Sequence, residues 1–219
     1  MSTTPVMKKI ATLAFLALLG LQALPQSEKY KAAMQTNISQ LDSAVAKNDL
    51  TDLANNFERI GDAEKTQWLP YYYAAYCNVM NAYLVTDKSK SDPLADKADA
   101  LIVKAATLNG KENSEIYVIR SMIASAHMMV DPQTRWQQYG QASSAAITKA
   151  KALDPSNPRP VYLEGQTKFY TPESFGGGKA PAKELFTKAL QMFDSFKPQS
   201  NLDPAWGKMS TQYFLSQCN

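Results

Sequence analysis

The chain has 219 residues, with 23 basic and 20 acidic side chains, a formal net charge of +3 and 45% hydrophobic residues. This near balance of charge excludes the broad basic surface that nucleic-acid binding needs, so we expect no nucleic-acid partner. The length suits one domain and is large enough for a continuous hydrophobic core without disulfide staples.

The first predicted element is a secretory leader at residues 1–26. Lys8 and Lys9 precede an uncharged apolar run at residues 10–24, and a polar chain follows. A basic start and a short apolar core are typical of a signal peptide. The run is shorter than the roughly 20 residues of a membrane-spanning helix, although an uncleaved anchor is the alternative. We expect residues 27–219 to form a single mature domain in the periplasm or outside the cell, with no membrane span.

Two helices are predicted next, and a third opens at a proline. Apolar residues at steps of three and four predict a helix over residues 27–47. Residues 50–60 form its expected partner, which ends at Gly61. Pro70 lies in the first turn of the following helix, where its missing N–H costs nothing.

A repeated pattern of small and bulky residues then predicts the architecture. Each copy places a small residue where a neighbouring helix presses closest and a bulky one in the space between turns. The copies are Ala98, Ile102, Ala105 and Leu108; Ser143, Ile147, Ala150 and Leu153; Ala182, Phe186, Ala189 and Met192; and, more weakly, Leu50, Ala54, Phe57 and Ile60.

Another apolar-periodic stretch lies upstream of each clear copy, at residues 69–84, 116–130 and 161–170. Two helices per unit, recurring along the chain, indicate an α-helical repeat. Ser121 and Gly165 fit the small, close-packing position of the first helices.

These segments resemble tetratricopeptide (TPR) repeats, whose second helix reads A-x3-F-x2-A. Ala182, Phe186 and Ala189 match that pattern best. The copies lie further apart than the family's roughly 34 residues, so insertions are expected at residues 87–93, 131–139 and 171–181. The resemblance implies an all-α, TPR-like α-solenoid of about four helix pairs with a C-terminal capping helix. The alternative is an irregular helical bundle.

The resemblance also implies that the first helices of each pair line a concave groove. Aromatic and arginine side chains there are typical of binding hot spots. For Arg159 a cap or loop-bracing role is favoured over ligand contact, whereas the tyrosines suit the groove and the core between repeats equally well. The candidate groove residues are Tyr72, Tyr76, Met122, Arg159, Tyr162, Gln166 and Phe169.

No pattern in the sequence predicts catalysis. His127 is the only histidine and has no clustered partners, so we expect no metal site. The Gly-Gly-Gly-Lys run at residues 176–179 lacks the surrounding residues of a phosphate-binding loop and predicts a turn. We therefore expect a protein that is not an enzyme and has no cofactor. Cys77 and Cys218 are expected to be free, a disulfide between them being the alternative.

Short loop motifs, such as Asp-Pro-Ala-Trp-Gly at residues 203–207, resemble those of exported TPR-like proteins of Bacteroidota. The sequence thus favours a non-enzymatic, TPR-like protein–protein interaction scaffold in the periplasm, binding a protein or peptide in its groove. The alternative is a periplasmic solute-binding protein of a transport system, for which we expect an enclosed apolar cavity.

Overall fold

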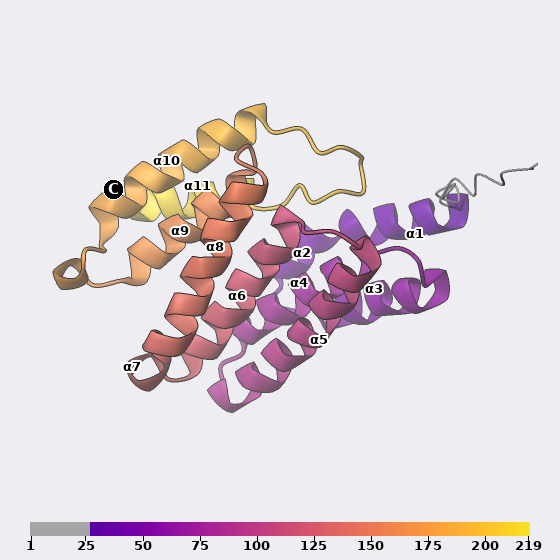
Figure 1. The fold of residues 1–219 in the computed structure, drawn as a ribbon, viewed down its shortest axis with the longest axis horizontal. Coiled ribbons are helices and arrows are strands. Elements are labelled where there is room, and N and C mark those ends of the chain that lie inside the picture. The colour runs from indigo at the N-terminus through magenta and orange to yellow at the C-terminus, as the bar shows by residue number, and fades with distance from the viewer. Residues whose placement is uncertain (1–26) are drawn as a thin grey trace, which may run out of the picture.

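The computed structural model describes residues 27–219, so the predicted leader lies outside the described residues. Within that range the chain forms helices and no strands, and the prediction of an all-α fold of packed helix pairs is confirmed (Figure 1). The longer helices are α1 (Glu28–Ile38), α2 (Leu41–Ala46), α3 (Thr51–Glu64), α4 (Leu69–Leu84), α5 (Ser91–Asn109), α6 (Ser114–Val130), α8 (Gln141–Leu153), α9 (Pro158–Tyr170), α10 (Lys179–Ser195) and α11 (Lys208–Gln217).

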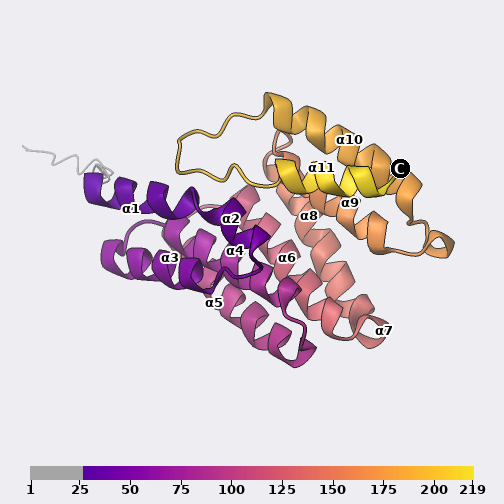
Figure 2. The ribbon, with the colours of Figure 1, turned by 180° about the vertical axis from the view of Figure 1, so that it is seen from behind.

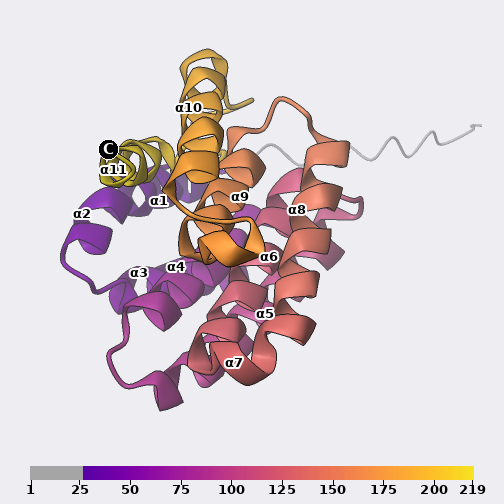
Figure 3. The same cartoon turned by 90° about the vertical axis from the view of Figure 1, so that its left-hand side faces the viewer.

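The helices pack as successive pairs across the molecule. In the three clear pairs α4 packs on α5, α6 on α8, and α9 on α10. The first helices of these pairs, α4, α6 and α9, also contact one another in that order and form an inner layer. The second helices, α5, α8 and α10, lie outside it (Figures 1 and 3).

The first three positions of the repeated pattern lie in the core, whereas the last bulky position of each copy is only half-buried: Leu108, Leu153, Met192 and Ile60. Ala98, Ile102 and Ala105 are fully buried on α5, and Ala182, Phe186 and Ala189 on α10. The predicted close approaches are present as well. The Ser121 and Ser143 hydroxyls are 2.9 Å apart between α6 and α8. A Cβ on Gly165 would lie 2.6 Å from the Phe186 ring, so only glycine lets α9 approach α10 this closely.

Two predicted helix boundaries are wrong. The expected helix over residues 27–47 is broken at Ser39 and Gln40, between α1 and α2, where the Gln40 amide donates to the Asn37 carbonyl three residues back instead of four. Helix α3 runs through Gly61 and ends at Glu64. Gly61 does not stop the helix; its missing side chain leaves room for the Tyr71 ring, which a Cβ would approach to 2.8 Å.

Short helices fill the segments that were expected to be insertions. They are η1 (Lys88–Lys90), α7 (Pro132–Arg135), the π-helical turn η2 (Trp136–Gly140) and η3 (Glu173–Phe175). Helix α5 begins at Ser91, inside the first of these segments, and the Ser91 hydroxyl donates a hydrogen bond to the Ala82 carbonyl. These turns connect the helices of a pair without opening the core.

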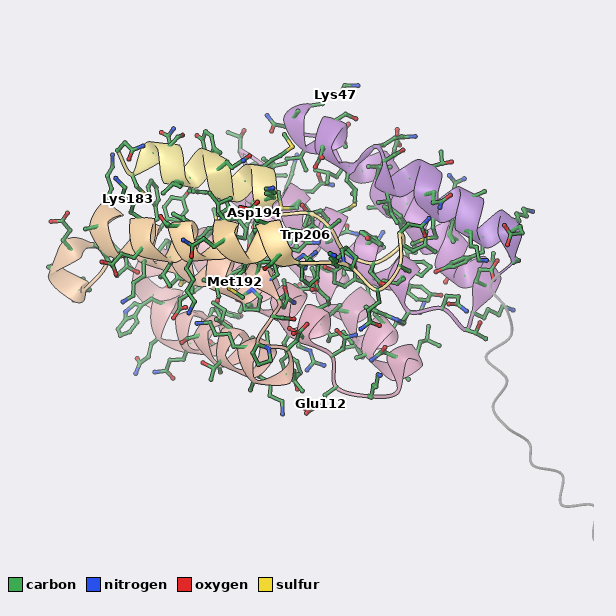
Figure 4. The ribbon with its side chains drawn as sticks, turned by 90° about the horizontal axis from the view of Figure 1, so that it is seen from above. Lys47, Glu112, Lys183, Met192, Asp194 and Trp206 are labelled. Atoms are coloured by element: carbon green, nitrogen blue, oxygen red, sulfur yellow. The ribbon has the colours of Figure 1, made fainter. Side chains whose placement is uncertain are left out.

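The C-terminal part of the chain crosses the inner layer. After α10, residues 196–207 form a long loop without a helix that leads back to α11, and α11 lies against α10 (Figures 2 and 4). The loop contacts α4, where the Tyr73 hydroxyl donates to the Leu202 carbonyl at 2.9 Å. One contiguous cluster of buried side chains extends from Tyr30 in α1 to Leu202 in this segment. Cys77 is buried, Cys218 is half-buried, and both are free. No helix within residues 27–219 is long and apolar enough to cross a bilayer.

Candidate functional site

The inner layer carries the residues that were expected to line a groove, and the chain's own C-terminal segment covers them. Tyr72 and Tyr76 on α4, Met122 on α6, and Arg159 and Tyr162 on α9 are all buried. Gln166 and Phe169 are half-buried at the far end of α9. Two parts of the C-terminal region pack on this set: residues 196–207 contact Tyr72, Tyr76 and Arg159, and α11 contacts Tyr162 and Phe169.

Arg159 fastens the segment of residues 196–207 to the inner layer. Asn157 caps the start of α9 by accepting the Arg159 amide, and this places the Arg159 side chain toward α6. Its guanidinium donates to Glu115 Oε1 at 2.9 Å and to the Pro204 carbonyl. The same cation lies over the Phe196 ring at 5.0 Å. Arg159 is fully buried, so its hydrogen bonds to Glu115 and Pro204 are part of the folded interior of this region.

Trp206 completes this contact (Figure 4). Its indole N–H donates to the Tyr72 hydroxyl at 2.9 Å, and that hydroxyl donates to Glu115 Oε2 at 2.8 Å. The Trp206 ring packs on Tyr76 with centroids 4.6 Å apart. Burial raises the pKa of both Tyr72 and Tyr76 well above the usual value, because a phenolate there would lose its hydration.

The remaining candidate groove residues pack beneath α11. The Phe214 ring lies 5.5 Å from Phe169 and 6.2 Å from Tyr162. Burial in this region raises the pKa of Tyr162. In this conformation the inner face therefore holds an extended segment and a helix of the same chain.

An open hollow lies on the other side of the molecule, between α6 and α8. Its volume is about 650 Å3, within the range of about 300–1,000 Å3 that is usual for ligand pockets. Side chains of α5, α6, η2 and α8 line it: Asp99, Tyr117, Arg120, Ile123, Ala124, His127, Tyr139, Ala142, Ala145, Ala146 and Lys149. The hollow is open to solvent on one side, so it is not the enclosed cavity that we expected of a solute-binding protein.

His127 and Tyr139 form one end of the hollow. Their rings are stacked with centroids 5.0 Å apart. His127 Nδ1 lies 2.8 Å from Asp92 Oδ1, and Nε2 lies 3.6 Å from Asp96 Oδ1. Arg135 donates to both Asp92 oxygens and thereby lowers the pKa of that carboxyl. These contacts hold the imidazole ring in place beside Tyr139 at the edge of the hollow.

The other end of the hollow is cationic. Arg120 lies 5.1 Å from the centre of the Tyr117 ring, and Lys149 lies 6.0 Å from it. Lys149 also pairs with Glu112 at 2.7 Å, and Glu112 accepts the Tyr117 hydroxyl at 2.9 Å. The Lys149 ammonium lowers the pKa of Glu112, and the pKa of Lys149 is raised in turn.

Sequence reasoning missed the hollow. On α8 the hollow is lined by Ala142, Ala145, Ala146 and Lys149. They form a second face of the helix, beside the core face of Ser143, Ile147 and Ala150. Steps of three and four along this second face are visible in the sequence. Its pairing with Tyr117 and Arg120 is a tertiary contact between helices, which the spacing within one helix does not predict. Within residues 27–219 no group of three or more His, Cys, Asp or Glu side chains is arranged so that it could hold a metal ion.

Comparison with known proteins supplies one match. No protein-family model and no curated protein matches the chain. A solved structure, the HusA haemophore from Porphyromonas gingivalis, matches with 36% sequence identity and a TM-score of 0.78. The match covers 88% of this chain and 94% of that one.

This match corrects the expected function. The prediction of a protein–protein interaction scaffold is wrong, because the matching protein is a haemophore. The alternative of a small-molecule binder agrees better with the comparison. The prediction that the protein is not an enzyme is confirmed by the same relative.

Proposed function

The chain belongs to the same family as the HusA haemophore, and on that ground we propose that it binds haem. The observation that carries the proposal is the 36% identity sustained over 88% of the chain, rather than a likeness of fold alone. A haem carrier needs an apolar, flat surface and groups that pair with carboxylates, and no catalytic residues. The described residues offer such surfaces without a catalytic constellation.

We further propose that the protein is exported to the periplasm or beyond the cell, and that its residues 27–219 form one mature TPR-like domain. The basic and apolar segment at residues 8–24 supports export. The relative comes from a species of Bacteroidota, and the loop motifs of this chain resemble those of exported proteins from that phylum. The recurring pairs α4–α5, α6–α8 and α9–α10 support the repeat assignment.

The expected groove residues give a second place where a ligand could bind. Tyr72, Tyr76 and Arg159 would contact it only after residues 196–207 had left the inner face. Because that segment fills the face through hydrogen bonds and ring contacts, a ligand there would have to displace buried partners. The open hollow needs no such displacement.

Absorbance titration of the purified protein with haem tests the proposal. We expect the haem absorption band to shift and to saturate with added protein, since transfer from water to an apolar site changes the surroundings of the ring. A spectrum identical to that of free haem at every protein concentration would contradict the proposed function. Protein unfolded in urea is the matched control, because it has the same composition without the assembled surface.

A further inference from the structure

The α8 wall of the hollow is built from small side chains. Ala142 and Ala145 are exposed there, and Ala146 lies just beneath them. Ile123 and Ala124 of α6 form the facing wall. Alanines at three adjacent positions leave a flat apolar surface from which no long side chain projects, so a planar ligand could approach the helix backbone closely.

The two ends of the hollow differ in chemistry. The stacked pair of His127 and Tyr139 offers a π-face at one end, where an aromatic ring gains offset stacking. At the other end, no carboxylate within residues 27–219 lies within ion-pair distance of Arg120. Glu112 lies close enough to feel the charge of Arg120, but it makes no ion pair with it, so the half-buried guanidinium is a ready donor for an anionic group of a ligand.

Lys149 is the second cation at this end. Its partner Glu112 and its own side chain are both about half exposed, at 54% and 43%. An exposed ion pair of this kind is worth little, so Lys149 can exchange Glu112 for a ligand carboxylate at small cost. One acidic side chain, the exposed Asp99 of α5, also lines the hollow and opposes an anion.

We propose that this hollow is where the ligand binds, with the flat ring against the alanine wall and the stacked rings, and the ligand's carboxylates paired with Arg120 and Lys149. The inference rests on the proposed function and names the site and the recognised class: a planar, apolar tetrapyrrole that carries carboxylates. Arg120 and Lys149 are then specificity-determining residues, since they distinguish the acid from its neutral ester.

The test compares haem with its dimethyl ester, whose carboxylates are masked, by titrating the full-length protein and its variants. Wild-type protein is expected to bind the ester about tenfold more weakly than haem, because charged hydrogen bonds are lost. Arg120→Gln combined with Lys149→Gln is expected to weaken haem binding about tenfold and to leave ester binding unchanged. Both side chains are partly exposed, so the variant should fold, which circular dichroism checks.

Two control variants, with substitutions outside the hollow, test the location of the site. Lys188→Gln removes an exposed lysine of α10 far from the hollow, and Tyr213→Ala removes an exposed aromatic residue of α11. Both should bind haem as the wild type does. If the double variant binds haem as tightly as the wild type, or if Tyr213→Ala alone loses binding, the assignment is overturned while haem binding stands. If the wild type binds neither compound, the proposed function itself fails.

Discussion

At the residue scale, Arg159 is a fully buried cation whose ion pair and hydrogen bonds lie in the protein interior. It pairs with Glu115, whose side chain is only 12% exposed, and donates to the Pro204 carbonyl. Arg159→Ala would leave the Glu115 carboxylate buried with an incomplete set of partners. We expect it to lower the free energy of unfolding by about 3–5 kcal/mol in urea titrations.

Lys97→Ala provides the comparison for Arg159→Ala. Lys97 pairs with Glu58 across α5 and α3, but its side chain is 43% exposed. Its removal should cost about 1 kcal/mol or less, because solvent screens the pair. Equal losses in the two variants would show that burial adds nothing to the Arg159 pair and would contradict this account.

The buried tyrosines predict a loss of stability in alkali. Burial raises the pKa values of Tyr72, Tyr73 and Tyr76 above the usual 10.0. Above about pH 10 the unfolded chain releases these protons while the folded chain keeps them, so the free energy of unfolding falls as pH rises. Each such tyrosine contributes a slope of about 1.4 kcal/mol per pH unit.

Tyr76→Phe tests this slope, since it removes one buried phenol and keeps the ring against Trp206. Urea unfolding between about pH 10 and pH 12 should show a shallower decline for this variant than for the wild type. Tyr213→Phe removes a phenol that is 61% exposed and should follow the wild type. Parallel curves for all three proteins would rule out the tyrosines as the cause.

At the scale of elements, the contact between α9 and α10 depends on Gly165. Gly165→Ala would place a Cβ 2.6 Å from the Phe186 ring and force the helices apart. We expect a loss of about 1–3 kcal/mol in the free energy of unfolding, typical of overpacking. Gly140→Ala is the control, because its Cβ would meet Met128 at an ordinary 3.5 Å and its φ of −65° suits any residue.

Combining Gly165→Ala with Phe186→Leu should restore part of the lost stability, since the smaller side chain removes the clash. If Gly165→Ala were as neutral as Gly140→Ala in thermal unfolding, the close approach of the two helices would not be rigid. The Gly165 prediction would then be wrong.

The helices were largely predictable because their cause is local. Steps of three and four placed α4, α6 and α10 from the sequence, and burial of Ile102 and Phe186 follows from that periodicity. Gly61 misled the prediction because glycine ends helices often, whereas here it admits the Tyr71 ring, a contact made only in the folded chain. The same holds for Trp206, whose partners on α4 lie far away in sequence.

At the scale of the whole molecule, the inner face and the hollow show why the function was not predictable. The candidate groove residues are buried or half-buried, and sequence spacing does not say that residues 196–207 and α11 pack on several of them. The hollow joins Tyr117 and Arg120 of α6 to Lys149 of α8, and neither helix alone predicts it. The proposal of haem binding rests on the relative, since no motif in the sequence indicates it.

Native mass spectrometry of the purified protein mixed with haem tests the central claim most directly, because it weighs the complex and needs no assumption about the site. The account predicts a population whose mass exceeds that of the protein by bound haem, and which is lost in the urea-unfolded control. Finding only the unliganded protein, at haem concentrations that saturate the absorbance of a known haem carrier measured alongside, would contradict it.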